Sequence, residues 1–119
     1  MPVLVTNNPL VDSVYRNEVR VEYNDESLKS LLIRVRDYIH SGYCLLTHPL
    51  SGSVKPNETP YKSVMISERS EGTDMRSVQI IEESLLAIQK FEPVCIPENC
   101  LPDLQIIDLA LIGPALENI

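Results

Sequence analysis

The sequence predicts one α/β domain over residues 1–119, with a mixed, mostly parallel sheet of about five strands and helices packed on it. Three observations lead to this prediction. A length of 119 residues is that of one ordinary domain. A hydrophobic content of 44% is enough to build a core. Strand-like apolar runs alternate along the chain with apolar residues at helical spacing, which is typical of strands joined by helices.

The first part of the chain predicts two strands and two helices. Residues 3–6 are apolar and β-branched, and a turn at Asn7-Asn8-Pro9 ends this strand. Residues 9–17 favour a short helix with a proline in its first turn. Residues 19–23 alternate between apolar and polar, as in a strand with one exposed face. A single apolar stripe after an Asn-Asp cap then predicts a helix that ends at Gly42; it comprises Leu28, Leu31, Leu32, Val35 and Ile39.

The middle of the chain predicts two more strands and a helix. Residues 43–47 form a continuous apolar run, which indicates a central strand covered on both faces. Residues 48–60 contain three prolines and a glycine and exclude regular structure. The strand predicted at 62–67 has no helix before it and is free to lie antiparallel. Thr73-Asp74 caps a second helix, which ends before Pro93 and has the stripe Val78, Ile81, Leu85 and Ile88.

Residues 104–111 allow two interpretations. Ile107, Leu109 and Leu111 alternate as in a strand, whereas Asp108 is able to cap a terminal helix that Gly113-Pro114 would break. We favour a strand followed by one helical turn.

The charge distribution limits the partners. Ten Lys and Arg residues stand against seventeen Asp and Glu residues, which gives a formal net charge of −7. Residues 1–66 are neutral, so the net charge lies in residues 67–119. An acidic chain repels nucleic acid and anionic lipid, so neither is expected as a partner. The acidic second half either keeps the protein soluble, which is the simpler interpretation, or meets a basic protein surface.

Cysteine use and the N-terminal sequence indicate a cytoplasmic protein without a metal. No basic segment followed by an apolar one opens the chain, and no apolar run approaches the roughly 20 residues of a membrane span. Three cysteines do not suggest a disulfide framework. Cys95 and Cys100 have a zinc-like spacing, but a second ligand pair is missing, and Cys44 is most simply a core residue.

Two predicted strands end in similar sequences, Thr6-Asn7-Asn8-Pro9 and Thr47-His48-Pro49. The carboxyl ends of parallel strands meet at one edge of a sheet, where ligands bind, so Asn7, Asn8 and His48 are expected to converge there. The long loop after His48 adds hydroxyls, amides and two lysines that suit a phosphate or carboxylate. The candidate ligand-binding residues are Thr6, Asn7, Asn8, Thr47, His48, Ser51, Gly52, Ser53, Lys55, Asn57, Tyr61 and Lys62.

Simpler interpretations exist for these residues. Ser, Asn and Pro are common in turns without any ligand, and the glycine spacing matches neither a P-loop nor a dinucleotide-binding motif. His48 is either hydrogen-bonded to the loop backbone or a general acid/base. A nucleophilic serine beside it lacks a clear orienting acid, so hydrolase chemistry is not favoured.

Four segments carry a resemblance to a known family. They are the turn 6–9, residues 36–42 (Arg-Asp-Tyr-Ile-His-Ser-Gly), the run 45–63 and residues 106–112 (Ile-Ile-Asp-Leu-Ala-Leu-Ile). Together they resemble the GrdX family, small proteins encoded beside the components of glycine, sarcosine and betaine reductases. The resemblance implies a cytoplasmic accessory of that metabolism. It implies no established activity, no catalytic residues and no cofactor.

Three functional hypotheses follow. The first is a non-catalytic module that binds a small anionic ligand, or a reductase component, through the 6–9 turn and the 47–62 loop. The alternative is a small enzyme with His48 as acid/base and Lys55 or Lys62 as an anion clamp. The third is an assembly subunit that acts through its acidic second half. Domains of this size often form homodimers, but no sequence feature selects a surface.

Overall fold

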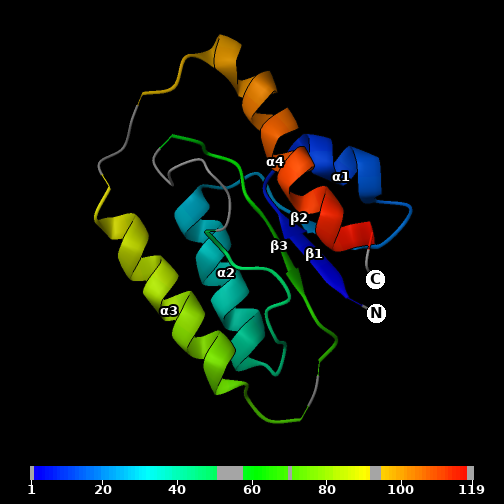
Figure 1. The fold of residues 1–119 in the computed structure, drawn as a ribbon, viewed down its shortest axis with the longest axis vertical. Helices are drawn as coiled ribbons and strands as arrows, with labels where there is room; N and C mark the ends of the chain where they lie inside the picture. The colour runs from blue at the N-terminus through cyan, green and yellow to red at the C-terminus, as the bar shows by residue number, and fades with distance from the viewer. Residues whose placement is uncertain (1, 51–57, 70, 92–94, 118–119) are drawn as a thin grey trace.

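The computed structural model describes residues 2–50, 58–69, 71–91 and 95–117. In this part of the chain, three strands form one sheet in the order β2-β1-β3 (Figure 1). The central strand β1, Val3–Thr6, pairs in parallel with β2, Arg20–Tyr23, and antiparallel with β3, Ser63–Ile66. The strands predicted at 3–6, 19–23 and 62–67 are therefore confirmed, and the third is antiparallel.

Four helices cover both faces of this sheet. Helices α1, Pro9–Tyr15, and α4, Leu101–Glu117, lie on one face, and α2, Leu28–His40, and α3, Met75–Gln89, lie on the other (Figure 1). A short 3₁₀ turn at Glu98–Cys100 precedes α4. None of the described helices is long and apolar enough to cross a bilayer.

Residues of β1 point alternately into two apolar clusters. Val3 and Val5 pack with the buried stripes of α2 and α3, and Leu4 packs with Val11 of α1 and Ile112 of α4. The strand is buried along its whole length because a helical layer covers each face.

Polar side chains cap the first three helices. Asp74 caps α3 as the sequence predicts, and Asn8, for which no cap was predicted, caps α1; each accepts a backbone N–H of the first turn. For α2 the cap is Ser27, not the expected Asn24-Asp25 pair. Gly42 follows the end of α2 with φ of 108°, a left-handed conformation that favours glycine.

The prediction of about five mostly parallel strands is wrong at two places. Residues 43–47 make only one isolated bridge, between Leu45 and Ile66. The amides of Leu46 and Thr47 both point to the carbonyl of Met65, and the Thr47 hydroxyl accepts the Met65 N–H at 3.0 Å. A side chain thus takes a hydrogen bond that a regular ladder would give to the backbone.

The strand predicted at 104–111 is wrong, because these residues belong to α4. On a helix, Leu109 and Ile112 reach the core while Ile107 and Leu111 stay exposed. The alternating apolar residues therefore do not share one face. Packing against the sheet and the burial of Asp108 override the local pattern.

Candidate ligand-binding site

A hydrogen-bonded polar cluster lies at the carboxyl end of β1. Its first member, Asn7, is 3% exposed. Its side-chain nitrogen donates to the carbonyls of Glu26 at 3.0 Å and Pro60 at 2.8 Å, and its oxygen accepts the Lys62 N–H at 2.9 Å. Asn7 therefore fixes the chain just before β3 against the turn that follows β1.

Asn8 ties together two helices of the same layer. Its Oδ1 accepts the Leu10 N–H at 3.0 Å and caps α1. Its Nδ2 donates to the Gln105 carbonyl and to Asp108 Oδ2, each at 3.0 Å. Both amide hydrogens are used within the protein, so Asn8 positions α4 instead of offering a donor to a ligand.

Asp108 is a buried carboxylate, 4% exposed, on the inner face of α4. Its Oδ2 accepts hydrogen bonds from Asn8 and from the Ser63 hydroxyl at 2.8 Å. The Thr6 and Ser63 hydroxyls lie 2.8 Å apart and extend this network to β1. Hydrogen bonds of this kind make the burial of a carboxylate tolerable.

Lys62 adds a cation to the cluster. The residue is 8% exposed, and burial lowers the pKa of its ammonium, while the nearby Asp108 carboxylate opposes that shift. Tyr61, its neighbour, accepts at its hydroxyl from Gln105 Nε2 at 2.9 Å. The end of the 47–62 loop is thereby held by β1 and α4 together.

The start of the same loop lines a different hollow. Leu45, Leu46, Thr47 and His48 face the first turns of α3 across a groove of about 580 Å³, which is completed by Asp74, Arg76, Ser77 and Ile80. A volume of this size is typical of small-molecule sites. The groove combines apolar walls with one imidazole, one guanidinium and one carboxylate.

His48 has a defined hydrogen-bonding role in this groove. Its Nδ1 accepts the Leu50 N–H at 3.1 Å, which leaves Nε2 as the ring nitrogen that donates. The exposed His48 thus presents an N–H donor. In this arrangement the ring is able to donate a hydrogen bond to an acceptor in the groove.

Asp74 and Ser77 give the groove a rigid wall. Asp74 Oδ2 accepts the Ser77 N–H at 3.1 Å and the Ser77 hydroxyl at 2.6 Å, and that hydroxyl accepts the Leu45 N–H at 3.0 Å. The hydrogen bonds from Ser77 lower the pKa of Asp74, with a smaller contribution from the charge of Arg76. Asp74 is therefore ionised at neutral pH.

The sequence-predicted residues fall into three groups. Thr6, Asn7, Asn8, Tyr61 and Lys62 belong to the polar cluster at the carboxyl end of β1. Thr47 and His48 line the groove against α3. Ser51, Gly52, Ser53, Lys55 and Asn57 lie outside the described residues.

The first two groups belong to different layers. Asn8 is bonded to α4, and His48 lines a groove with α3 on the other face of the sheet, instead of the one rim expected for both. The position of residues 44–47 explains this difference, because they lie along the outer side of β3 and not beside β1.

Sequence reasoning missed six polar residues of these two sites: Ser63, Asp74, Arg76, Ser77, Gln105 and Asp108. One of them carried a usable signal. Asp108 is the single charged residue in the apolar stretch 104–116, and a lone acid there indicates a buried, partnered carboxylate. The others carry no comparable signal in the sequence.

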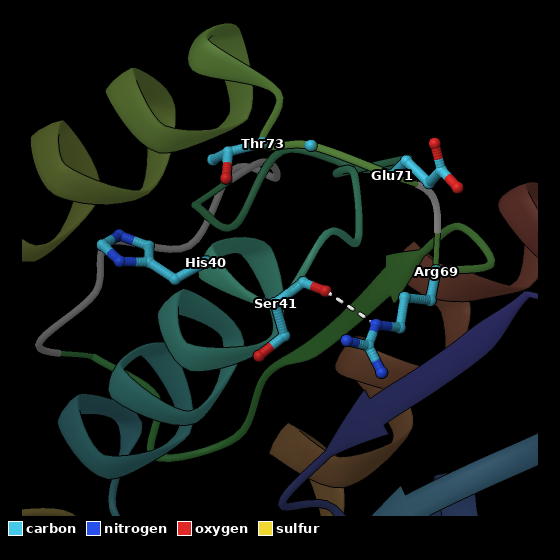
Figure 2. Close-up of a pocket in the computed structure, with 6 residues that line it drawn as sticks. His40, Ser41, Arg69, Glu71 and Thr73 are labelled. Atoms are coloured by element: carbon cyan, nitrogen blue, oxygen red, sulfur yellow. Dashed lines mark hydrogen bonds between the residues drawn. The ribbon is translucent and has the colours of Figure 1, made fainter.

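A second hollow, of about 570 Å³, lies at the end of the sheet away from the polar cluster, where Arg69 follows β3. Figure 2 shows His40 and Arg69 on two sides of it, with Ser41 between them. Arg69 Nε donates to the Ser41 carbonyl at 3.0 Å. Its lining, which contains none of the predicted ligand-binding residues, is His40, Ser41, Arg69, Glu71, Gly72 and Thr73.

The described residues contain no group of three or more His, Cys, Asp or Glu side chains arranged to hold a metal ion. Cys95 and Cys100 are exposed free thiols.

Comparison with known proteins identifies a family. A family model described as GrdX-like protein matches residues 3–117, nearly the whole chain. Neither the curated proteins nor the solved structures contain a match.

Proposed function

The chain belongs to the GrdX-like protein family, and from that premise we propose that it is a non-catalytic accessory that binds a small carboxylate- or phosphate-bearing molecule in the groove beside His48. Family membership suggests an association with glycine reductase-related systems. The observation that carries the binding proposal is that His48 and Arg76 line one groove of about 580 Å³.

Arg76 supplies the main anion contact. It is exposed in the first turn of α3, and no described residue accepts a hydrogen bond from its side chain. A guanidinium binds a carboxylate or phosphate with two parallel hydrogen bonds. The Nε2–H of His48 adds a third donor from the opposite wall.

Asp74 narrows the ligand class. Its ionised carboxylate lines the same groove and repels a second negative charge on the ligand. A molecule with one carboxylate and one cationic group, such as an amino acid or a methylated ammonium acid, fits this charge pattern better than a dianion. Inorganic phosphate and a dicarboxylate are therefore the weaker binders within the proposed class.

Thermal unfolding in the presence of glycine, betaine, succinate and inorganic phosphate tests the proposal. A ligand at one hundred times its Kd stabilises the fold by about 2.7 kcal/mol, which is several degrees for a domain of this size. Glycine or betaine is expected to give the largest shift. The proposal is wrong if none of the four compounds changes the melting temperature.

Three variants locate the binding. Arg76→Gln is expected to weaken binding at least about tenfold, because a charge-assisted contact is lost. Lys90→Gln removes the same charge at the other end of α3 and serves as the matched control. His48→Asn keeps an acceptor for the Leu50 N–H and a side-chain donor, so its affinity stays within about tenfold of the wild type. If Arg76→Gln and Lys90→Gln weaken ligand binding equally, the ligand does not bind in this groove.

A further inference from the structure

The solvent-facing side of α4 is apolar. The outer α4 face comprises Ile106, Ile107, Ala110, Leu111 and Pro114, all exposed. Its three large side chains, Ile106, Ile107 and Leu111, are 55%, 41% and 43% exposed. The inner side of the helix is apolar as well, since Leu109 and Ile112 pack against the sheet. A helix that covers one face of a sheet is normally polar on its outer side, so an apolar outer face indicates a further contact.

The spacing on this face is that of a helix that enters a groove. Ile107, Leu111 and Pro114 stand at positions i, i+4 and i+7, which place them in one line along the helix. No charged side chain interrupts the outer α4 face between Asp103 and Glu117, because the only charged residue between them, Asp108, is buried.

The charges on α4 and on the segment before it have one sign. Residues 95–117 contain the acids Glu98, Asp103, Asp108 and Glu117 and no lysine or arginine. Asp103 and Glu117 are exposed at the two ends of the outer α4 face. A complementary surface is therefore apolar in its centre and basic at its rim.

We propose that the outer α4 face docks into an apolar groove on a protein partner whose rim carries lysine and arginine. A second copy of the chain fits poorly, because antiparallel α4 helices would bring Asp103 of one copy beside Glu117 of the other. An anionic membrane surface fits poorly for the same reason, since interfacial helices carry basic residues on their polar side.

The helix is held in position for docking. Asp108 fixes α4 to Asn8 and Ser63, and Ile112 anchors it in the core. A face that is already rigid loses little conformational entropy when a partner covers it. The surface lies on the opposite face of the sheet from the groove beside His48, so the proposal stands independently of the ligand site.

Site-specific photo-crosslinking in cells of the native host tests this inference. A photoreactive p-benzoylphenylalanine replaces Leu111 in one variant and Leu86 in the control, because Leu86 is 58% exposed on α3 in the other layer. The expected result is one protein adduct from position 111 that is missing from position 86, with crosslinked peptides that contain apolar and basic residues. The proposal is overturned if position 111 crosslinks to a second copy of the chain or to lipid. It is also overturned if positions 111 and 86 give the same adduct, or if no adduct forms.

The second readout is the affinity of the chain for the purified partner protein that the crosslinking identifies. Ile107→Asp is expected to weaken the complex at least about tenfold, because a central apolar anchor becomes charged. Asp103→Lys and a rise from about 0.05 to 0.5 M NaCl are each expected to weaken it several-fold. A complex that tolerates Ile107→Asp, or that tightens with Asp103→Lys, contradicts the proposed face. Ile107→Asp is expected to leave unchanged the rise in melting temperature that glycine and betaine cause. A failure of the docking proposal is therefore distinguishable from a failure of the proposed ligand site.

Discussion

Replacement of Asn8 by aspartate isolates the hydrogen bonds that hold α4 on the sheet. The two side chains have nearly the same size, and Asp caps a helix as well as Asn does, so α1 keeps its N-cap. The change removes the two donations from Nδ2, to the Gln105 carbonyl and to Asp108. It also places a second carboxylate beside the buried carboxylate of Asp108.

The expected loss follows from these contacts. A hydrogen bond to a charged group contributes about 1.5–3 kcal/mol, and one to a neutral carbonyl about 0.5–1.5 kcal/mol. Repulsion between the carboxylates at positions 8 and 108 adds to the loss, so Asn8→Asp is expected to lower the free energy of unfolding by at least about 3 kcal/mol. For a chain of this length, the melting temperature falls by roughly 12 °C.

Urea unfolding at neutral pH measures the effect, with Asn17→Asp as the control. Asn17 is exposed in the turn after α1, so the same chemical change there costs at most about 0.5 kcal/mol. The double variant Asn8→Asp with Asp108→Asn restores the bond in the reverse direction and is expected to regain about 2 kcal/mol. If the losses of the two single variants simply add in the double variant, the two side chains are not coupled and this account is refuted.

Three further predictions concern titration and packing. The pKa of Asp74 is lower in the folded protein than in the unfolded chain, so its ionised carboxylate stabilises the fold above the unfolded-state pKa, and this stability is lost as the pH falls through the folded-state pKa. Ser77→Ala removes one cause of the lowered pKa. The free energy of unfolding in urea is therefore expected to depend less on pH in this variant between about pH 5 and 2. Because the pKa of Lys62 is lowered in the folded protein, the unfolded chain binds the proton of this ammonium group more tightly than the folded protein does. The wild type therefore gains stability relative to Lys62→Met as the pH rises toward about 10.4, and parallel pH profiles of unfolding would contradict the burial of this charge. Leu32→Ala, at 0% exposure, is expected to cost about 2–5 kcal/mol in denaturant unfolding. Leu86→Ala, at 58% exposure, is expected to cost far less, and equal losses would refute the described core.

Sequence periodicity predicts the parts of the fold whose partners lie nearby in the chain. The stripe from Leu28 to Ile39 and the cap at Asp74 fix α2 and α3 by local rules, and the structure confirms both helices. The alternation at Ile107, Leu109 and Leu111 misleads because α4 is apolar on both sides, so no polar face marks its helical period.

The candidate sites depend on partners far apart in sequence. Asn7 and Lys62 were expected in one site, Asn7 at the end of the first predicted strand and Lys62 at the end of the 47–62 loop, and the structure joins them by a hydrogen bond. The partner of Asn8 is 100 residues away, at Asp108, and no local pattern links them. Arg76 faces His48 only because residues 45–48 follow the outer side of β3 and not the side of β1.

The bond between Asn8 and Asp108 also bears on how the chain acquires its shape during synthesis. The central strand β1 is made well before α4, the helix that covers one of its faces, because the other two strands and the other helices lie between them in the chain. Until α4 is made, α1 alone covers Leu4 and Met65 on that side, and contacts of such long sequence separation form slowly. The newly made chain therefore depends on α4 to complete the cover of an apolar strand, and truncation before α4 is expected to yield aggregates instead of a smaller folded protein.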